Sequence, residues 1–448
     1  MKNITIFGAG RSSSSLIQYL IFNAEQEQWN ITIADKHLGL AQKLTNGSEH
    51  VKLLELDIKD EEQVKTLVQN SDAVISMLPA HMHISIANYC VEFSKHMITA
   101  SYVSPEMKAL DEKAKEKGVV MMNEIGVDPG IDHLSAMRVI DKIRETGGAM
   151  EAFETFTGGL VAPDSDNNPW NYKFTWNPRN VVLAAQGTVK FIQNGQYKYI
   201  PYHKVFRRTE IIEIDDYGKF EGYANRDSLK YRSVYGLKDI PTMYRGTLRR
   251  PGFCRAWDVF VQLGMTDDTY IMEGSEDMTY REFVNSFLAY NPHDSVELKL
   301  KHYMNIAQDD IGFFEKFEWL GLFENTKIGL KDATPAQILQ HILEQKWKLE
   351  PSDKDMIVMW HRFLFKINNE FKEIHSSLVV KGDDQTFTAM AKTVGLPVAI
   401  VTKMILNKTI TTPGVHIPVY KEVYNPVLDE LEHYGISFIE KEEEPRFY

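Results

Sequence analysis

The sequence has little cysteine and no excess of positive charge. Cys90 and Cys254 are the only two cysteines, they lie far apart, and neither sits in a spacing typical of zinc ligands. A disulfide framework is therefore excluded, and a reducing compartment is favoured. The net charge is −12, which argues against nucleic acid as the main partner.

Long apolar runs are also missing, so we expect no segment that spans a bilayer. The first residues enter a strand directly, and we expect no signal peptide. Hydrophobic residues make up 43% and charged residues 25% of the 448-residue chain, which is typical of a globular protein with two or three domains. These features predict a cytoplasmic enzyme with no membrane partner.

The N-terminus carries a pattern of strand, glycine turn and helix. Residues 4–7 are a short apolar strand, Gly8 and Gly10 follow, and an apolar-periodic helix comes next. Gly8 permits a tight turn, and Gly10 lets a pyrophosphate approach the backbone at a helix N-terminus. Ser13 stands where a third glycine is usual. The position of the motif favours dinucleotide binding over a plain turn.

The second strand, residues 31–34, ends in Asp35 and Lys36. An acid at this place takes the ribose hydroxyls of NAD, whereas a basic residue accommodates the additional phosphate of NADP. Both charges are present side by side. The alternative is a solvated charge pair in a loop.

Four more strands are predicted at residues 51–56, 73–78, 97–100 and 119–122, with helices between them. Asp60 and Ser104 are expected to begin two of these helices. The alternation predicts a doubly wound parallel sheet. His81 and His83 open one helix but should point to different faces, so we expect no metal site. The cofactor-binding candidates at the strand ends are Gly8, Ala9, Gly10, Arg11, Ser12, Asp35, Lys36, Asp57, Ile58, Leu78, Pro79, Ala100, Ser101, Val127, Asp128 and Pro129.

Residues 123–133 (NEIGVDPGIDH) join the sixth strand to a helix predicted over residues 134–144. Gly126, Pro129 and Gly130 force a turn, which places Asp128 just past the carboxyl end of a strand, where open α/β sheets bind ligands. Asp128 suits proton transfer, although it is equally placed to cap the next helix. For His133 a structural role is favoured.

The pattern changes after about residue 150. Residues 153–156 alternate before Gly158 and Gly159 are expected to break the strand, and further strands are predicted at residues 220–223 and 243–248. Arg226 and Arg245 lie at or beside these strands, a setting that favours carboxylate binding. Residues 279–349 have helical periodicity, with one helix beginning at Thr334. Residues 363–367 and 374–380 predict a hairpin, and residues 386–406 one or two helices broken at Gly395 and Pro397.

Several of these motifs resemble the glutamate-forming saccharopine dehydrogenases, also called saccharopine reductases. The matching segments are residues 101–105 (SYVSP), 123–133, 158–163 (GGLVAP), 172–176 (YKFTW), 225–228 (NRDS), 245–249 (RGTLR) and 389–397 (AMAKTVGLP). The resemblance covers nearly the whole chain. Carboxynorspermidine dehydrogenases share the architecture but match the central motifs less well.

The resemblance implies an α/β fold in three parts and a homodimer. Residues 1–132 would form a Rossmann domain, with residues from about 405 to 448 packing back on it. Residues 133–270 and 360–404 would form a mixed-sheet α/β domain for substrate binding and dimerisation. Residues 271–359 would form a small helical domain.

The resemblance also implies a reaction, in which aminoadipate semialdehyde and L-glutamate form an imine that NADPH reduces to saccharopine. Asp128 and Tyr102 would be catalytic, and hydride transfer belongs to the cofactor. The substrate-binding set would be Ser101, Tyr102, Asp128, Arg226, Arg245, Gly246 and Thr247. No metal is implied.

Two positions depart from the family pattern. Thr157 stands where the family often has a cysteine, and Lys36 stands where the NADP-type pattern has an arginine. Asp35 beside it would repel an additional phosphate, so we predict a relaxed or NAD-leaning specificity. Two other functions stay open: a related imine reductase acting on a carboxynorspermidine or carboxyspermidine type of substrate, and a non-catalytic NAD(P)-binding regulator.

Overall fold

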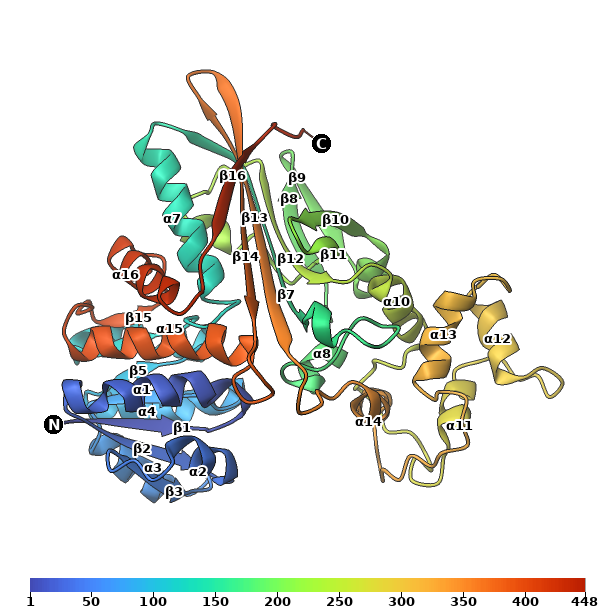
Figure 1. Ribbon diagram of the computed structural model, residues 1–448, viewed down its shortest axis with the longest axis horizontal. Coiled ribbons are helices and arrows are strands. Elements are labelled where there is room, and N and C mark those ends of the chain that lie inside the picture. The colour runs from blue at the N-terminus through green and yellow to red at the C-terminus, as the bar shows by residue number, and fades with distance from the viewer. Residues whose placement is uncertain (448) are drawn as a thin grey trace. The chain divides into compact units, whose positions relative to one another are not determined.

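The computed structural model describes residues 1–447. These residues divide into two compact units. Unit 1 contains Met1–Glu151, Val234–Gly236 and His361–Phe447, and unit 2 contains Ala152–Ser233 and Leu237–Trp360. Each unit is therefore built from segments that are distant in the sequence, and Figure 1 shows the N-terminal and C-terminal segments of unit 1 side by side.

A seven-stranded parallel sheet forms the centre of unit 1, in the order β15-β6-β5-β4-β1-β2-β3. Its strands are β1 (Lys2–Phe7), β2 (Trp29–Asp35), β3 (Val51–Glu55), β4 (Ala73–Ser76), β5 (His96–Ile98), β6 (Val120–Met122) and β15 (Gly414–His416). The first six confirm the predicted strands and the doubly wound parallel sheet. The chain changes direction between β1 and β4, which is the point where such sheets bind ligands.

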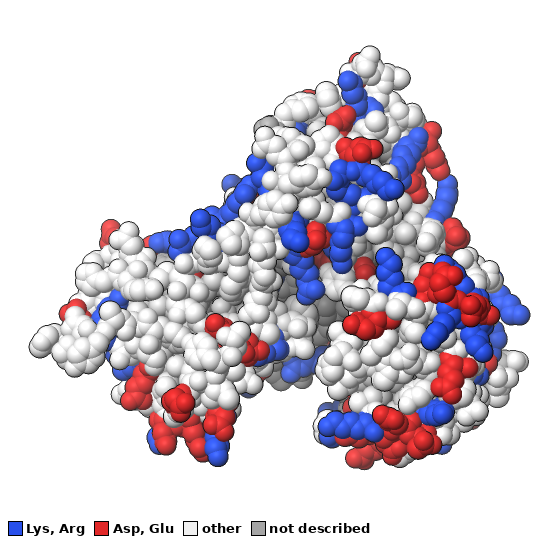
Figure 2. Space-filling model, turned by 180° about the vertical axis from the view of Figure 1, so that it is seen from behind, with Lys and Arg blue, Asp and Glu red and all other residues white. Residues whose placement is uncertain are grey.

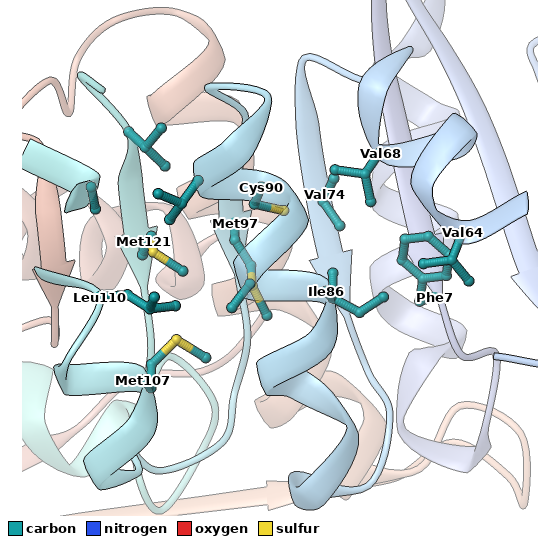
Figure 3. Packing of buried hydrophobic residues seen from close by; sticks show 14 of the residues in the cluster. Phe7, Val64, Val68, Val74, Ile86, Cys90, Met97, Met107, Leu110 and Met121 are labelled. Atoms are coloured by element: carbon teal, nitrogen blue, oxygen red, sulfur yellow. The ribbon is translucent and has the colours of Figure 1, made fainter. Parts of the chain in front are cut away.

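Unit 1 also contains helices, most of which lie along this sheet (Figure 1). They are α1 (Ser14–Glu27), α2 (Gly39–Thr45), α3 (Glu61–Gln69), α4 (His83–Glu92), α5 (Pro105–Lys108), α6 (Asp111–Glu116), α7 (Ile131–Glu145), α15 (Ala389–Leu406) and α16 (Lys421–Glu432). Asp60 and Ser104 cap α3 and α5 through their side chains, as predicted. Figure 3 shows part of the core, where Val64 of α3 lies beside Phe7 and where Ile86 and Cys90 of α4 come between strand residues.

Helix α15 corrects two expectations. It is continuous through Gly395 and Pro397, where a break was predicted. A Cβ on Gly395 would lie 2.8 Å from the backbone nitrogen of Leu16, so this glycine serves a close approach to α1. The helix is also long and apolar enough to cross a membrane by length and composition, which the sequence reading missed. However, 83% of it is buried, as in a core helix, so it is weak evidence for a membrane.

Unit 2 contains a mixed sheet, as predicted. Strand β7 (Ala149–Val161) pairs in parallel with β12 (Thr242–Arg249), which pairs antiparallel with β11 (Gly218–Ala224), and β10 (Thr209–Ile214) follows β11. Strands β8 (Val189–Gln193) and β9 (Gln196–Ile200) form a hairpin beside β12. The expected break at Gly158 is wrong. A Cβ there would lie 2.7 Å from the carbonyl oxygen of Leu248, so Gly158 lets β7 continue close to β12.

The rest of unit 2 is mainly helical. Its helices are α8 (Pro178–Val182), α9 (Tyr231–Val234), α10 (Phe253–Leu263), α11 (Tyr280–Asn285), α12 (Val296–Tyr303), α13 (Ile311–Trp319) and α14 (Pro335–Lys346). This confirms the helical reading of residues 279–349. Thr334 and Gln337 form a capping box at the start of α14, where the sequence predicted a helix start.

Strand β13 (Asp355–Ile367) begins in unit 2 and ends in unit 1, and β14 (Glu370–Lys381) follows it as the predicted hairpin. Within unit 1, β14 pairs antiparallel with β16 (Ile439–Glu443). The surface carries charges of both signs. Figure 2 shows acidic side chains gathered in several clusters on the face drawn, with lysine and arginine side chains among and above them.

Candidate active site

The glycine turn has the geometry that a dinucleotide needs. Gly8 has a positive φ of 97°, and a Cβ on it would lie 3.0 Å from the backbone of Met77, so only glycine fits there. A Cβ on Gly10 would meet nothing within 4 Å, which leaves room for a phosphate before α1. Ser13, at the third position, donates a hydrogen bond to the carbonyl of Gly10 at 2.7 Å. Arg11 and Ser12 lie in the short helical turn that follows Gly10.

A cavity of about 240 Å³ lies at the ends of β1, β2 and β3 in unit 1. Its lining residues are Phe7, Ala34, Asp35, Lys36, Leu56, Asp57, Ile58, Lys59, Leu78 and Met82. Five of these, namely Asp35, Lys36, Asp57, Ile58 and Leu78, are cofactor-binding candidates from the sequence. The apolar walls and the charged rim suit an adenosine with its ribose, so the residues present fit a nicotinamide dinucleotide.

The two charged residues at the end of β2 are held differently. The Asp35 carboxylate accepts hydrogen bonds from the backbone N–H groups of Ala9 at 2.6 Å and His37 at 2.8 Å. Lys36 pairs with Asp57 at 3.3 Å. A hydrogen bond from the Lys59 backbone, and then the one from Lys36, lower the pKa of Asp57. Asp35 therefore braces the glycine turn, while Lys36 lies on the exposed rim of the cavity.

The turn between β6 and α7 is tightly constrained. A Cβ on Gly130 would lie 2.0 Å from the carbonyl oxygen of Gly126, and Gly126 in turn lies against the Cβ of Ala100. The peptide bond between Asp128 and Pro129 is cis. Helix α7 begins after Gly130 without a side-chain cap, and the Asp132 carboxylate accepts from the Gly130 N–H at 2.6 Å. The Asp128 side chain is half-buried at the carboxyl edge of the sheet, two residues after Gly126 and next to the buried Val127.

His133 lies in a buried polar cluster. One ring nitrogen bonds the Glu124 carboxylate at 2.9 Å, and the other bonds the Tyr235 hydroxyl at 2.5 Å. Glu124 also accepts from the backbone N–H of Val103 at 3.1 Å. The cluster thus ties the segment that carries Tyr102, which is half-buried, to the segment that carries Asp128. This is the structural role that the sequence favoured for His133.

A second polar chain was missed. The Oγ of Ser101 lies 2.7 Å from His83 Nε2, and the Oγ of Ser76 lies 2.7 Å from His83 Nδ1. From the sequence, a metal-ligand role was the only function weighed for His83, and no metal site was expected there. Within the part of the chain that the structure describes, no group of three or more His, Cys, Asp or Glu side chains could hold a metal ion. A histidine at the start of the helix after β4 was the available signal. Its contact with Ser101 depends on the pairing of β4 with β5, which the sequence does not fix.

The predicted carboxylate-binding residues lie together in unit 2. Arg245 of β12 is buried, and its guanidinium lies over the Tyr231 ring, 4.3 Å from the ring centroid. The backbone N–H of Asn225 donates to the Arg245 carbonyl at 2.9 Å, which brings the exposed Arg226 next to this strand. A Cβ on Gly246 would lie 2.2 Å from Phe156, so the glycine lets β12 pass that ring.

Thr247 faces Tyr223 of β11 and Thr157 of β7 in the strand register. Thr157, which replaces the family cysteine, is buried, and within residues 1–447 its hydroxyl has no hydrogen-bond partner. Buried hydroxyls of this kind are uncommon and call for an explanation such as a bound ligand or water. Thr157 is therefore a polar group available next to the predicted substrate-binding strand.

Comparison with known proteins gives consistent matches along the chain. Residues 4–122 match the family model described as the saccharopine dehydrogenase NADP binding domain. Residues 126–436 match the model described as the saccharopine dehydrogenase C-terminal domain. Together the two models cover most of the sequence.

Individual relatives agree with the family models. The chain is 31% identical to saccharopine dehydrogenase [NADP(+), L-glutamate-forming] of Schizosaccharomyces pombe, over 98% of this chain and 99% of that protein. It is 32% identical to the mitochondrial alpha-aminoadipic semialdehyde synthase of Rattus norvegicus, over 98% of this chain but 47% of that protein, so it spans about half the length of that relative. The apo saccharopine dehydrogenase (L-Glu forming) structure from Saccharomyces cerevisiae matches with a TM-score of 0.89 and 31% identity, covering 99% of this chain and 100% of that one.

Proposed function

The chain belongs to the saccharopine dehydrogenase family, and from this premise we propose that it interconverts saccharopine with aminoadipate semialdehyde and L-glutamate in lysine metabolism. In the oxidative direction, saccharopine would lose a hydride from carbon to the oxidised cofactor and a proton from its secondary amine, and water would hydrolyse the resulting imine to the aldehyde and glutamate. The observation that carries the proposal is the similarity to the glutamate-forming enzymes over the full length of both chains.

We infer that residues of unit 1 hold the cofactor. Gly8, Ala9, Gly10, Arg11 and Ser12 would receive the pyrophosphate, and the cavity that contains Asp35 and Lys36 would receive the adenosine. Pro79, Ala100, Ser101, Val127 and Pro129, at the carboxyl edge of the same sheet, would lie along the nicotinamide half. The bound cofactor supplies hydride transfer, and the protein supplies position and charge.

We infer proton-transfer and substrate roles for four residues. Asp128 is a half-buried carboxyl that would exchange a proton with the secondary amine of saccharopine, and Tyr102 would orient a substrate group or relay a proton. Arg226 and Arg245 would bind substrate carboxylates, since a planar guanidinium matches a carboxylate with two hydrogen bonds. Gly246 and Thr247 would line the same subsite on β12.

The remaining inferences concern organisation. We propose that residues 1–132 with about 405–448 act as the cofactor domain, that 133–270 and 360–404 act as the substrate and dimerisation domain, and that 271–359 form a helical insert. A homodimer and a cytoplasmic location are also proposed. The family resemblance supports the dimer, and two free, buried cysteines suit a reducing compartment.

The activity is tested by spectrophotometry. Purified protein is mixed with saccharopine at alkaline pH and with NADP or NAD, and reduced cofactor is followed. Turnover is expected with at least one of the two. Binding of a cofactor without turnover of saccharopine would contradict the proposal. Turnover of carboxynorspermidine instead would favour the related imine reductase, and no turnover of either compound would favour a regulator.

Arg245→Ala tests the substrate assignment. Loss of a buried carboxylate partner should raise the KM for saccharopine by about a hundredfold, since truncating one member of such a pair costs about 2–5 kcal/mol. The Kd for NADPH should stay unchanged. Arg250→Ala is the matched control, because Arg250 follows the same strand but stacks on Phe220 and donates to the Tyr217 carbonyl. Unchanged saccharopine kinetics in Arg245→Ala would contradict the substrate assignment.

A further inference from the structure

Three side chains of unit 1 form a continuous hydrogen-bonded chain at the carboxyl edge of the parallel sheet. Ser76 is the last residue of β4, His83 is the first residue of α4, and Ser101 follows β5. His83 Nδ1 lies 2.7 Å from the Oγ of Ser76, and Nε2 lies 2.7 Å from the Oγ of Ser101. The imidazole therefore bridges two neighbouring strand ends.

The His83 imidazole, at the centre of these hydrogen bonds, is buried and neutral. His83 is 4% exposed and Ser76 is 1% exposed. Desolvation by burial, with a smaller contribution from the charge of His81, lowers the pKa of His83 to about 4. At neutral pH one ring nitrogen therefore carries a proton and the other is an acceptor.

The hydrogen bonds of Ser76 indicate which nitrogen carries the proton. Within residues 1–447 the Ser76 hydroxyl has no hydrogen bond other than the one to His83. If it accepted from Nδ1, its own proton would be buried without an acceptor, which costs free energy. Ser76 therefore donates to Nδ1, and Nε2 donates to the Oγ of Ser101. Because the Ser101 hydroxyl accepts from His83, its own proton is directed away from the imidazole. Ser101 is half-buried, so this proton can be donated to a ligand at the edge of the sheet.

We propose that His83 is a positioning residue that holds the Ser101 hydroxyl as a hydrogen-bond donor to an oxygen atom of a bound ligand. The proposal rests on the proposed function, which places Ser101 where cofactor and substrate meet. The acceptor is an sp² oxygen with negative or partial negative charge. Two sources have this chemistry: a carboxylate of the amino-acid substrate and the carboxamide of the nicotinamide ring.

The experiment compares Ser101→Ala, His83→Phe and the double variant. The Kd for NADPH, the Kd for saccharopine and kcat are measured for each by calorimetry and steady-state kinetics. Each single variant should raise the Kd of the same ligand about tenfold, which is the effect expected when one hydrogen bond to an oxygen acceptor is lost. The double variant should bind that ligand with the same Kd as Ser101→Ala, because His83 acts through Ser101. The ligand whose Kd rises is the one that carries the acceptor oxygen.

Two further variants distinguish positioning from simple structural support. His83→Gln keeps an N–H donor near Ser101 and should bind both ligands within about threefold of the wild type. Ser76→Ala keeps the imidazole but removes the hydroxyl that fixes which ring nitrogen carries the proton. It should therefore raise the Kd of the same ligand by less than His83→Phe does. The control is His96→Gln, at the amino end of β5, where the histidine accepts from the Val120 N–H and should leave both Kd values unchanged.

The outcomes separate the two proposals. Wild-type protein that fails to turn over saccharopine contradicts the proposed function, while the NADPH Kd values still test His83. The positioning role would be overturned if the effects of the two single variants on Kd multiplied in the double variant. It would also be overturned if His83→Phe lowered Tm but left both ligand affinities unchanged. Rescue by His83→Gln together with a non-additive double variant would support it.

Discussion

At the scale of single residues, we expect cofactor choice to depend on Asp35 and Lys36. The Asp35 carboxylate is held by two backbone N–H groups and cannot turn without releasing its hydrogen bond to Ala9 in the glycine turn. The Lys36 side chain is 65% exposed, and within residues 1–447 its one ion pair is with Asp57 on the rim, so its ammonium can move to a 2′-phosphate. We therefore expect catalytic efficiencies with NADPH and NADH that lie within about tenfold of each other. A much higher efficiency with NADPH would contradict this prediction.

Lys36→Gln separates the two residues. Removing the one cation at the end of β2 should lower kcat/KM with NADPH by about tenfold, since it deletes one charge-assisted contact, and should leave NADH almost unchanged. The measurement is kcat/KM for saccharopine oxidation or its reverse with each cofactor. Lys52→Gln is the control, because Lys52 is an exposed lysine of the neighbouring strand β3 and does not line the cavity. Equal losses with both cofactors would show that Lys36 does not read the phosphate.

At the scale of elements, β13 and β14 in unit 1 contain a buried ionic cluster. Glu373 accepts from Arg362 at 2.9 Å, from His375 at 2.7 Å and from the Arg446 N–H at 2.9 Å. Burial alone would raise the pKa of Glu373, but these hydrogen bonds outweigh it and lower the pKa to about 2. Because the folded-state pKa is below the ordinary value, the ionised carboxylate stabilises the fold fully above about pH 4.3, and this stability is lost as the pH falls toward 2.

Glu373→Gln should therefore lower the free energy of unfolding by about 3 kcal/mol at pH 7, because it removes the ionised carboxylate that accepts from Arg362 inside the buried cluster. The difference from the wild type should stay constant between pH 8 and 5 and shrink below about pH 4.5. Urea unfolding at each pH measures it, with the exposed Glu370→Gln as control. A difference that does not change with pH would rule out the carboxylate as its source.

The elements that the sequence predicted well are those whose patterns are local. Strands β1 to β6 follow apolar runs, and α3, α5 and α14 begin at the capping residues that were expected. The errors lie where distant packing overrides a local signal. From the neighbouring sequence alone, Gly158 and Gly395 predict breaks. In the structure, Gly158 instead allows β7 to lie close to β12, and Gly395 allows α15 to lie close to α1. Strand β15 has three residues and pairs with β6, which lies almost 300 residues earlier in the sequence, so no local pattern predicts it.

The candidate site divides in the same way. The residues that line the cavity at the ends of β1, β2 and β3 follow strand ends, so their proximity could be predicted from the parallel sheet alone. His83 could not be assigned to Ser101, because that contact depends on the position of α4 over β4 and β5. The buried setting of Thr157 likewise depends on the pairing of β7 with β12.

At the scale of the whole molecule, unit 1 needs its C-terminal segment. Strand β15 completes the sheet next to β6, and the Ser14 hydroxyl donates to the Thr386 carbonyl at 2.6 Å. Val398, Ala399, Ile400 and Val401 of α15 are completely buried. Residues 1–151 without this segment would expose the β6 edge and the face of α1 that α15 covers.

We therefore expect residues 1–151 alone to lack a cooperative unfolding transition and to bind NADPH weakly. Residues 1–151 joined through a flexible Gly/Ser linker to residues 361–447 should unfold cooperatively and bind NADPH with a Kd within about tenfold of that of the full chain, since the glycine turn and the adenosine cavity lie entirely in these segments. Near-UV circular dichroism, thermal unfolding and NADPH fluorescence measure both pieces beside the full chain. If residues 1–151 alone unfolded cooperatively and bound NADPH like the full chain, the first six strands would be self-sufficient and the C-terminal segment would be an addition to a complete fold.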